Sequence, residues 1–143
     1  MAHQKTMLVT GCSGGGIGAA IALNLAKKGH FVFATARSPS KIPEELTNLS
    51  NVAALQLDIA SAPSVAEAAK SVAKTTKARG SEGLDGLVNN AGRGYSMPLL
   101  DVNIDKAIQL HDTNVWGVLR TVQAFSDLLI RKRGRVVNVS SLG

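Results

Sequence analysis

The sequence predicts an α/β fold, a doubly wound parallel sheet covered by helices on both faces in three α/β/α layers. Three observations indicate it. Short apolar runs alternate with longer helical stretches from residue 6 to residue 139, which is the pattern of successive βαβ units. A glycine-rich segment, "VTGCSGGGIGAAIA" at residues 9–22, begins at the end of the first apolar run. The 143 residues are 45% apolar, which suits one soluble domain over residues 1–143.

The first half of the chain predicts three strands with a helix after each. The strands are expected at residues 6–10, 31–35 and 52–57, where the runs are short and apolar. The helices are expected at residues 17–28, 40–49 and 61–79. Gly29 and Gly80 follow the first and third helices, and Pro43 lies near the first turn of the second, where proline is tolerated.

The second half predicts two more strands and one long helical stretch. The strands are expected at residues 84–88 and 135–139, and the helix at residues 104–133 with a break or bend near Trp116 and Gly117. Since crossovers between parallel strands are right-handed, we expect the strand order 3-2-1-4-5. No internal repeat, linker or low-complexity segment divides the chain.

The net charge of +6 bears on the kind of partner. The basic residues are scattered and fall near the ends of the expected helices, where cations complement the helix macrodipole. One Trp, one Tyr and three Phe are too few for base-stacking platforms. The sequence therefore predicts no nucleic-acid partner, and its surplus charge favours anionic small molecules.

Cysteine usage and the apolar runs bear on the compartment. Cys12 is the one cysteine, which rules out an internal disulfide and fits a reducing environment. The N-terminal residues lack the shape of a signal peptide, and the longest apolar stretch, residues 17–26, is far too short for a membrane span. We therefore expect an intracellular, cytoplasmic protein with no transmembrane segment and no metal site, and peripheral contact with lipid membranes stays open.

The glycine-rich segment lies between the first strand and the first helix. Glycine there allows positive φ and lets the backbone approach a pyrophosphate, whose charge faces the helix N-terminus. A tight strand–helix turn without a ligand is the alternative. Five glycines in this context favour a phosphate-binding loop.

The pattern Thr10-Gly11-x-x-x-x-Gly16-Ile17-Gly18 resembles the cofactor loop of the short-chain dehydrogenase/reductase superfamily, classical type, whose domain is Rossmann-type. That family usually has three residues between the first two glycines, whereas this chain has four. A second register, from Gly11 to Gly15, would put Ile17 where the last glycine belongs. The resemblance implies these cofactor-binding residues: Gly11, Ser13, Gly16, Ile17 and Gly18.

The end of the second strand indicates which nicotinamide cofactor binds. An acidic residue there would bond the adenosine ribose hydroxyls and favour NAD, but "ATARSPSK" at residues 34–41 has none. Arg37 offers a guanidinium fork for a 2′-phosphate, so NADP(H) is predicted, and a solvated surface arginine is the alternative. By the same resemblance Asp58, after the third strand, would meet the adenine, although a helix-cap or turn role explains it nearly as well.

Two further stretches resemble motifs of the same family. "LVNNAGRG" at residues 87–94 matches its Asn-Asn-Ala-Gly motif at the end of the fourth strand, which implies that Asn90, Ala91 and Gly92 bind the ribose and nicotinamide. Asparagine is a poor residue inside a helix, so Asn114 suggests a special role. In the family an asparagine followed by glycine three residues later holds a water of a proton relay, while a satisfied structural Asn114 is the alternative.

The chain ends in "GRVVNVSSLG", residues 134–143. In the family this strand presents the catalytic serine, and Ser141 matches that position better than Ser140. A tyrosine and a lysine four residues apart then transfer the proton and grip the ribose. No such pair occurs in this sequence, because position 99, four residues after Tyr95, is leucine. The resemblance therefore covers the front half of a family domain, without strands six and seven, and leaves the fifth strand as an apolar edge.

The favoured hypothesis is an NADP(H)-dependent oxidoreductase that moves a hydride between nicotinamide and a small-molecule carbonyl or alcohol. This chain would be its cofactor-binding part, inactive alone and homo-oligomeric in the full-length form. The alternatives are a non-catalytic nucleotide-binding module and a truncated, inactive gene product. The glycine loop and residues 29–41 are also similar to fungal members that resemble acyl-dihydroxyacetone-phosphate reductases.

Overall fold

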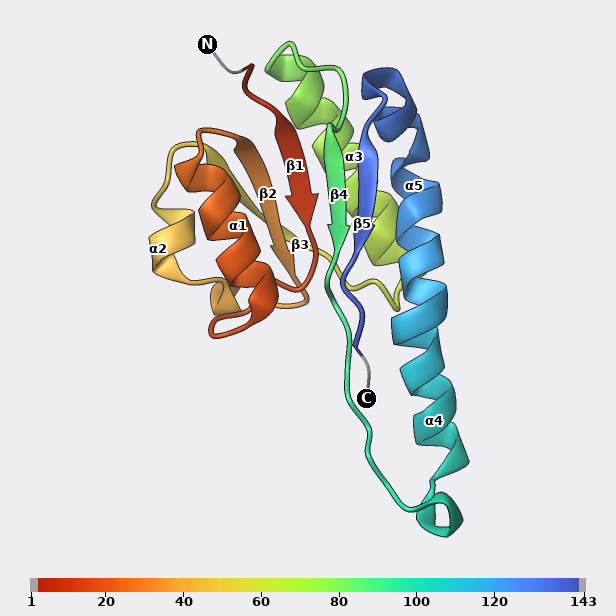
Figure 1. The fold of residues 1–143 in the computed structure, drawn as a ribbon. Helices are drawn as coiled ribbons and strands as arrows, with labels where there is room; N and C mark the ends of the chain where they lie inside the picture. Colours follow the sequence, from red (N-terminus) through yellow and green to blue (C-terminus); the bar gives the residue numbers. More distant parts are fainter. Residues whose placement is uncertain (1–2, 142–143) are drawn as a thin grey trace.

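The computed structural model describes residues 3–141, which form one five-stranded parallel sheet (Figure 1). The strand order is β3-β2-β1-β4-β5, which confirms the predicted order. The strands are β1 (Thr6–Val9), β2 (Phe31–Ala36), β3 (Val52–Gln56), β4 (Gly86–Asn89) and β5 (Arg135–Asn138). In the central strand β1, Leu8 lies opposite Phe33 of β2 on one side and opposite Leu87 of β4 on the other.

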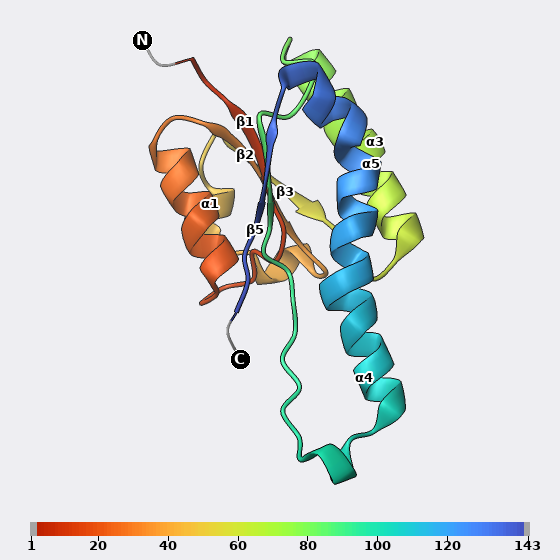
Figure 2. The same cartoon turned by 45° about the vertical axis from the view of Figure 1, so that its right-hand side comes forward.

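Helices cover both faces of the sheet, as the sequence predicts. They are α1 (Ile17–Lys27), α2 (Glu44–Thr47), α3 (Ala62–Ala78), α4 (Ile104–His111) and α5 (Gly117–Lys132). α1 and α2 lie on one face, and α3 and α5 lie on the other (Figure 1, Figure 2). Because each helix returns the chain to the amino ends of the strands, all five strands deliver their carboxyl ends to one edge.

The two faces are packed with side chains of different size. On the α1 face, Ala19, Ala22 and Ala26 recur on one side of the helix and pack into a buried cluster with Val9 and Val32. Short side chains allow a helix to lie close to the sheet. The N-terminus of α1 is thereby held beside the end of β1.

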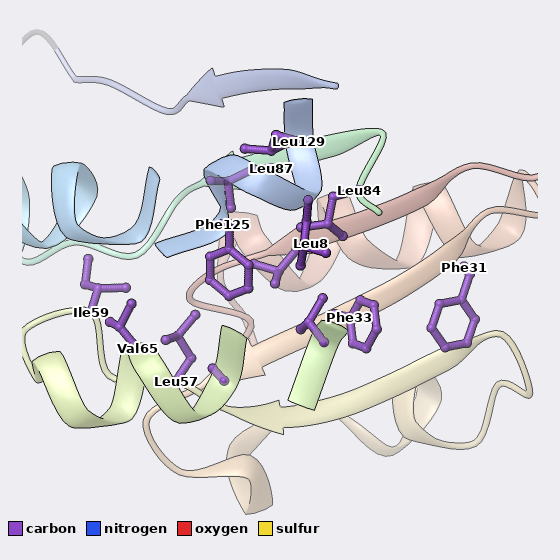
Figure 3. Packing of buried hydrophobic residues seen from close by; sticks show 13 residues of the cluster. Leu8, Phe31, Phe33, Leu57, Ile59, Val65, Leu84, Leu87, Phe125 and Leu129 are labelled. Carbon is purple, nitrogen blue, oxygen red and sulfur yellow. The ribbon is translucent and has the colours of Figure 1, made fainter. Parts of the chain in front are cut away.

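The opposite face holds the larger side chains (Figure 3). Leu8 from β1, Phe33 from β2 and Leu87 from β4 contribute to the same cluster as Val65 of α3 and Phe125 of α5. Phe125 is fully buried, and truncating such a residue to alanine typically costs about 3–5 kcal/mol. This cluster fixes α5, and with it the segment that precedes α5, against the sheet.

The helix expected at residues 40–49 is divided by Pro43. Pro39–Lys41 form a 3₁₀ turn, and α2 begins only at Glu44. Ile42 is extended, with φ −73° and ψ 129°, because the ring of a following proline disfavours helical backbone in the residue before it. Pro43 therefore ends the first turn instead of starting a helix that includes it.

The long helical stretch after residue 103 continues from α4 to α5 without a break. Between α4 and α5 the chain forms a π-helical turn at Asp112–Trp116. α4 and the loop before it, residues 90–103, extend well beyond the carboxyl edge of the sheet (Figure 2). A π turn inserts an extra residue into a helix and often marks a functional position.

β5 forms an exposed edge of the sheet in residues 3–141, as expected. All four of its residues are exposed, including Val136 and Val137. On the inner side β5 pairs with β4, and Asn89 Nδ2 donates to Asn138 Oδ1 at 2.9 Å.

Candidate cofactor site

A cleft of about 390 Å³ lies at the carboxyl edge of the sheet. Its walls are the glycine loop, the residues that follow β2, β3 and β4, and Thr113 of the π turn. In open parallel sheets ligands bind at this edge, where the crossovers leave in opposite directions, and here β1 and β4 flank that point. The volume falls in the usual range of small-molecule sites.

Every predicted cofactor-binding residue except Gly18 lines this cleft. These are Gly11, Ser13, Gly16, Ile17, Arg37, Asp58, Asn90, Ala91 and Gly92. Gly18 lies just behind the wall, in the first turn of α1. The structure thus brings together predicted residues from four separate segments, and their roles toward a cofactor stay predictions.

Gly11 and Gly18 have no room for a side chain, because neighbouring segments of the chain occupy the space that a Cβ would need. Gly11 has φ +72°, and a Cβ there would lie 2.8 Å from the Ala91 Cα. A Cβ on Gly18 would collide with the Gly11 carbonyl and with Asn90 Nδ2. α1, the glycine loop and the Asn-Ala-Gly segment are therefore packed backbone to backbone.

Two side chains hold these segments together. Asn90 Nδ2 donates to the carbonyls of Thr10 and Gly11, both at 3.1 Å. The buried Thr10 Oγ1 accepts from the backbone N–H groups of Asn90 at 3.0 Å and Ala91 at 2.9 Å. The polar groups of Thr10 and Asn90 build the floor of the cleft, and Thr10 is a residue whose part the sequence reasoning missed.

The rest of the loop is tied to the neighbouring strand. The Cys12 N–H donates to the Thr35 carbonyl at 2.8 Å, and the Gly14 N–H donates to the Lys41 carbonyl at 2.9 Å. Gly14 belongs to the four-residue interval that exceeds the usual family spacing. This part of the loop therefore lies against the segment after β2.

Cys12 serves the loop as a neutral, buried donor. Its Sγ contacts the carbonyls of Val9 at 3.3 Å and Gly18 at 3.7 Å. Burial raises the pKa of the thiol to about 11, against a smaller lowering by the backbone hydrogen bond from Thr35. A thiol with such a pKa does not act as a nucleophile near neutral pH.

The N-terminus of α1 faces this loop with its first N–H groups free for a ligand. Gly16 is the cap residue, no side chain caps the helix, and no acidic residue lies in the first turn. An uncapped helix N-terminus carries about half a positive charge and binds phosphate. The residues present therefore fit a pyrophosphate group.

Arg37 and Asp58 lie at the other end of the cleft. Arg37 follows β2, its side chain is exposed, and its carbonyl accepts from Gln56 Nε2 at 3.1 Å. Asp58 Oδ1 accepts from the Ala60 N–H at 3.0 Å, which is a turn role. The cap of α3 is Ser61, whose Oγ accepts from the Ser64 N–H. Asp58 is thus a turn residue that also lines the cleft.

Asn114 occupies the middle of the π turn and holds the loop after β4. Its Nδ2 donates to the Arg93 carbonyl at 2.8 Å, and its Oδ1 accepts from the Arg93 N–H at 2.9 Å. Gly92 lies against the same amide, since a Cβ there would be 3.3 Å from Oδ1. The amide is satisfied structurally, and a relay role for Asn114 stays a prediction.

A second anchor behind the π turn is not apparent from sequence spacing. Arg120 Nη1 donates to the Ile59 carbonyl at 2.6 Å, and its Nη2 bonds Asp112 Oδ1 at 3.0 Å. One guanidinium thus connects α5, the π turn and the loop after β3. Only the eight-residue spacing of Asp112 and Arg120 on one helix face hints at the pair, and nothing local predicts Ile59.

Ser141, predicted as catalytic, follows β5 at the same edge of the sheet and is exposed. The Val139 N–H donates to the Asn89 carbonyl at 2.9 Å, which continues the pairing of β5 with β4 toward the serines. Tyr95 is occupied elsewhere, with its hydroxyl accepting from the Asn103 N–H at 3.1 Å.

Among residues 3–141, no helix is long and apolar enough to cross a membrane, and no cluster of metal-binding side chains occurs.

Known proteins are similar to this chain in sequence. The chain is 42% identical to a short-chain dehydrogenase of Talaromyces islandicus, over 96% of this chain and 47% of that protein. It is 40% identical to the NADPH-dependent 1-acyldihydroxyacetone phosphate reductase of Schizosaccharomyces pombe, over 99% of this chain and 46% of that protein. It thus spans about half the length of the curated relatives it matches.

Among solved structures, an alcohol dehydrogenase of the archaeon Thermococcus sibiricus complexed with 5-hydroxy-NADP superposes with a TM-score of 0.87. It is 32% identical, and the match covers 97% of this chain and 59% of that one. The model of the short chain dehydrogenase family matches residues 5–143. With the Rossmann-type sheet and the cleft described above, this match shows that the chain belongs to the short-chain dehydrogenase family.

Proposed function

We propose that the protein is an NADP(H)-dependent oxidoreductase that transfers a hydride between nicotinamide and a carbonyl or alcohol substrate. One observation carries the proposal: the uncapped N-terminus of α1 and the Asn90-Ala91-Gly92 segment line a single cleft at the carboxyl edge. That arrangement suits an anionic dinucleotide, whose pyrophosphate needs N–H donors and whose rings need a smooth floor.

The cofactor would lie along the cleft, with its nicotinamide riboside at one end, its adenosine at the other and its pyrophosphate between them. Gly16, Ile17 and Gly18 offer the helix N-terminus to the pyrophosphate, and Ala91 and Gly92 leave room for the nicotinamide riboside. Asp58 lies at the adenine end and Arg37 beside the adenosine ribose. Arg37 supports NADP(H), and so do the two relatives whose names include NADPH and 5-hydroxy-NADP.

When bound, the cofactor supplies the hydride donor or acceptor. The chain's own residues orient it: Asn114 fixes the backbone of Arg93, and Arg93 follows the floor of the cleft. Ser141, at the same edge, is proposed to bind the substrate oxygen. Since the 143 residues contain no Tyr-x-x-x-Lys pair, we expect them to bind the cofactor without turning over substrate.

The cofactor assignment is tested by Arg37→Ala. The variant should weaken NADPH binding about tenfold or more and leave NADH nearly unchanged, because only NADPH carries a 2′-phosphate for the guanidinium. Fluorescence titration of both cofactors measures this, with Arg131→Ala at the opposite edge as the control. Equal loss of NADH and NADPH would overturn the assignment to NADP(H).

Assays of turnover and of cofactor binding separate a chain that is active alone, a chain that only binds the cofactor, and an inactive product. NADPH consumption is measured with a panel of aldehydes and ketones that includes 1-acyldihydroxyacetone phosphate, the substrate named for the S. pombe relative. Cofactor binding without turnover agrees with a cofactor-binding part or a non-catalytic module, and loss of both agrees with an inactive product. The absence of a Tyr-x-x-x-Lys pair favours the first outcome.

We also propose self-association and a cytoplasmic location. α4, the π turn and the start of α5 expose Ile104, Ile108, Trp116 and Leu119, between 47% and 67% each. Apolar residues gathered in this way mark protein interfaces, so a homo-oligomer through α4 and α5 is supported. The single buried thiol of Cys12 supports an intracellular, reducing compartment.

A further inference from the structure

The amino edge of the sheet, opposite the cleft, carries most of the protein's positive charge. Every strand begins at this edge, and α1, α3 and α5 end at it (Figure 1). We call it the basic face and define it by the cations of residues 5, 27–28, 74–79 and 131–135 and the acids at 82, 85 and 127. The basic face holds ten of the 16 Lys and Arg but only three of the ten Asp and Glu, so its net charge is +7. The remaining residues together carry −1, which gives the net charge of +6 for the whole chain.

Contacts between the ends of separate elements make this face continuous. The Arg79 guanidinium, after α3, lies 3.6 Å from the centre of the Phe31 ring at the start of β2. Its Nη2 donates to Gln4 Oε1 at 3.2 Å, and Gln4 Nε2 donates to the Gly29 carbonyl after α1. Lys74 and Lys77 of α3 share one groove with Arg131 of α5. The cations therefore belong to one surface.

Helix macrodipoles explain only a part of this charge. The C-terminus of a helix carries about −0.5 charge, so three helix ends account for roughly −1.5. A local surplus of +7 exceeds this several-fold. The three acids of the face are already subtracted in this figure, and one of them, Asp85, accepts from the Thr6 N–H at 2.8 Å. The excess is available to an external polyanion.

The composition of the face selects among polyanions. Phe31, its one aromatic side chain, is 5% exposed, so no ring is offered for stacking on nucleic-acid bases. Ile130, in contrast, is 73% exposed beside Arg131–Arg133. An exposed aliphatic side chain among cations, on a surface that spans three helix ends, suits the headgroup region of a bilayer.

We propose that the basic face docks the protein on an anionic phospholipid surface. In this orientation the cofactor cleft points away from the membrane, because the two lie at opposite edges of the sheet. A dinucleotide and a substrate would then reach the cleft from the aqueous side. The docking is independent of the function proposed above and holds whether or not the cleft binds NADP(H).

The test is cosedimentation of the protein with vesicles of phosphatidylcholine alone or with 30% phosphatidylserine. Binding should require phosphatidylserine and fall steeply between 0.1 and 0.5 M salt. Lys77→Gln/Arg131→Gln should lower the partition coefficient about 25-fold, since each cation near an anionic surface contributes about fivefold. Both side chains are exposed, and circular dichroism checks that the variant is folded.

The matched control is Lys41→Gln/Lys106→Gln, which removes the same charge from outside the basic face. It should keep most of the binding. Equal loss in both variants would show an effect of net charge alone and overturn the basic face as the docking surface. Absence of phosphatidylserine-dependent binding, or retention by RNA in preference to vesicles, would overturn the membrane as its partner.

Discussion

Thr10 serves two backbone donors with one side-chain oxygen. It is 1% exposed, and its Oγ1 accepts from both Asn90 and Ala91 at the point where β1 gives way to the glycine loop. Both donors belong to half-buried residues, and the acceptor that they share is this buried hydroxyl. A threonine that follows an apolar strand thereby sets the position of the floor of the cleft.

Thr10→Val keeps the shape of the side chain and removes the acceptor. We expect it to lower the free energy of unfolding by about 1–3 kcal/mol, because two partly buried N–H groups lose their acceptor. Urea denaturation measures the loss. Thr10→Ser keeps the hydroxyl and should cost under about 1 kcal/mol. A cost of Thr10→Val no larger than that of Thr10→Ser would contradict the role of the hydroxyl as the shared acceptor.

The raised pKa of the Cys12 thiol makes the free energy of unfolding fall at alkaline pH. The unfolded thiol loses its proton near 9.0 and the folded one near 11, so the folded state holds a proton that the unfolded state releases. The contribution to stability is full below pH 9 and falls by roughly 2–3 kcal/mol as the pH rises to 11. Denaturation of wild type and Cys12→Ala across this range should show a shallower decline for the variant, and parallel curves would contradict the assignment.

At the scale of elements, the π turn connects the cofactor cleft to the body of the domain. Asn114 holds the loop after β4 from one side of the turn, and Arg120 with Asp112 holds the loop after β3 from the other. Gly117 lies so close to Ile59 that a Cβ would stand 2.9 Å from its side chain. The turn therefore couples the two walls of the cleft formed by the loops after β3 and β4.

Arg120→Met should loosen this coupling. We expect weaker cofactor binding by about three- to tenfold and a shift in the fluorescence of Trp116, the one tryptophan, which lies in the π turn. The carbonyl of the buried Ile59 loses a charged donor in this variant. Arg120→Lys should recover part of both signals, and Asp112→Asn, which leaves the bond to Ile59, should disturb binding less. Unchanged Trp116 emission in Arg120→Met would contradict the coupling.

Most elements can be predicted from the sequence because their signals are local. The alternation of apolar runs predicts all five strands and their order, and glycines or Ser61 mark helix ends. The division at Pro43 and the π turn could not be predicted with the same sharpness. Pro43 is compatible with a first helical turn by its own φ, and a π turn depends on anchors such as Ile59 that are far away in sequence.

In the candidate site, too, the features with local signals could be predicted and those that depend on distant segments could not. The glycine loop and the Asn-Asn-Ala-Gly segment are read from short patterns, and their residues line one cleft. The bonds of Thr10 and Arg120 join segments about 60–80 residues apart, so spacing does not reveal them. The dual placement of Asp58, in a turn and at the cleft, shows why the two explanations could not be separated from sequence.

At the scale of the molecule, α4 and the π turn present the apolar surface proposed for self-association. Ile108→Lys should shift the protein toward monomers, because a charge at the centre of an apolar contact is left unpaired. Light scattering after size-exclusion chromatography measures the mass. Leu100→Lys, in the loop before α4 and 96% exposed, is the control for apolar exposure in general. An unchanged mass for Ile108→Lys would contradict an interface on α4.

The central place of β1 also sets the order in which the molecule can be assembled. β1 is synthesised first, yet one of its edges pairs with β4, whose partner residue for Met7 is Gly86. At roughly 5–20 residues per second, a ribosome needs about 4–16 s to supply that partner. During this interval a hydrophobic strand has an open edge within the growing chain. Folding thus depends on long-range pairing, which is slow and leaves the growing chain exposed to aggregation.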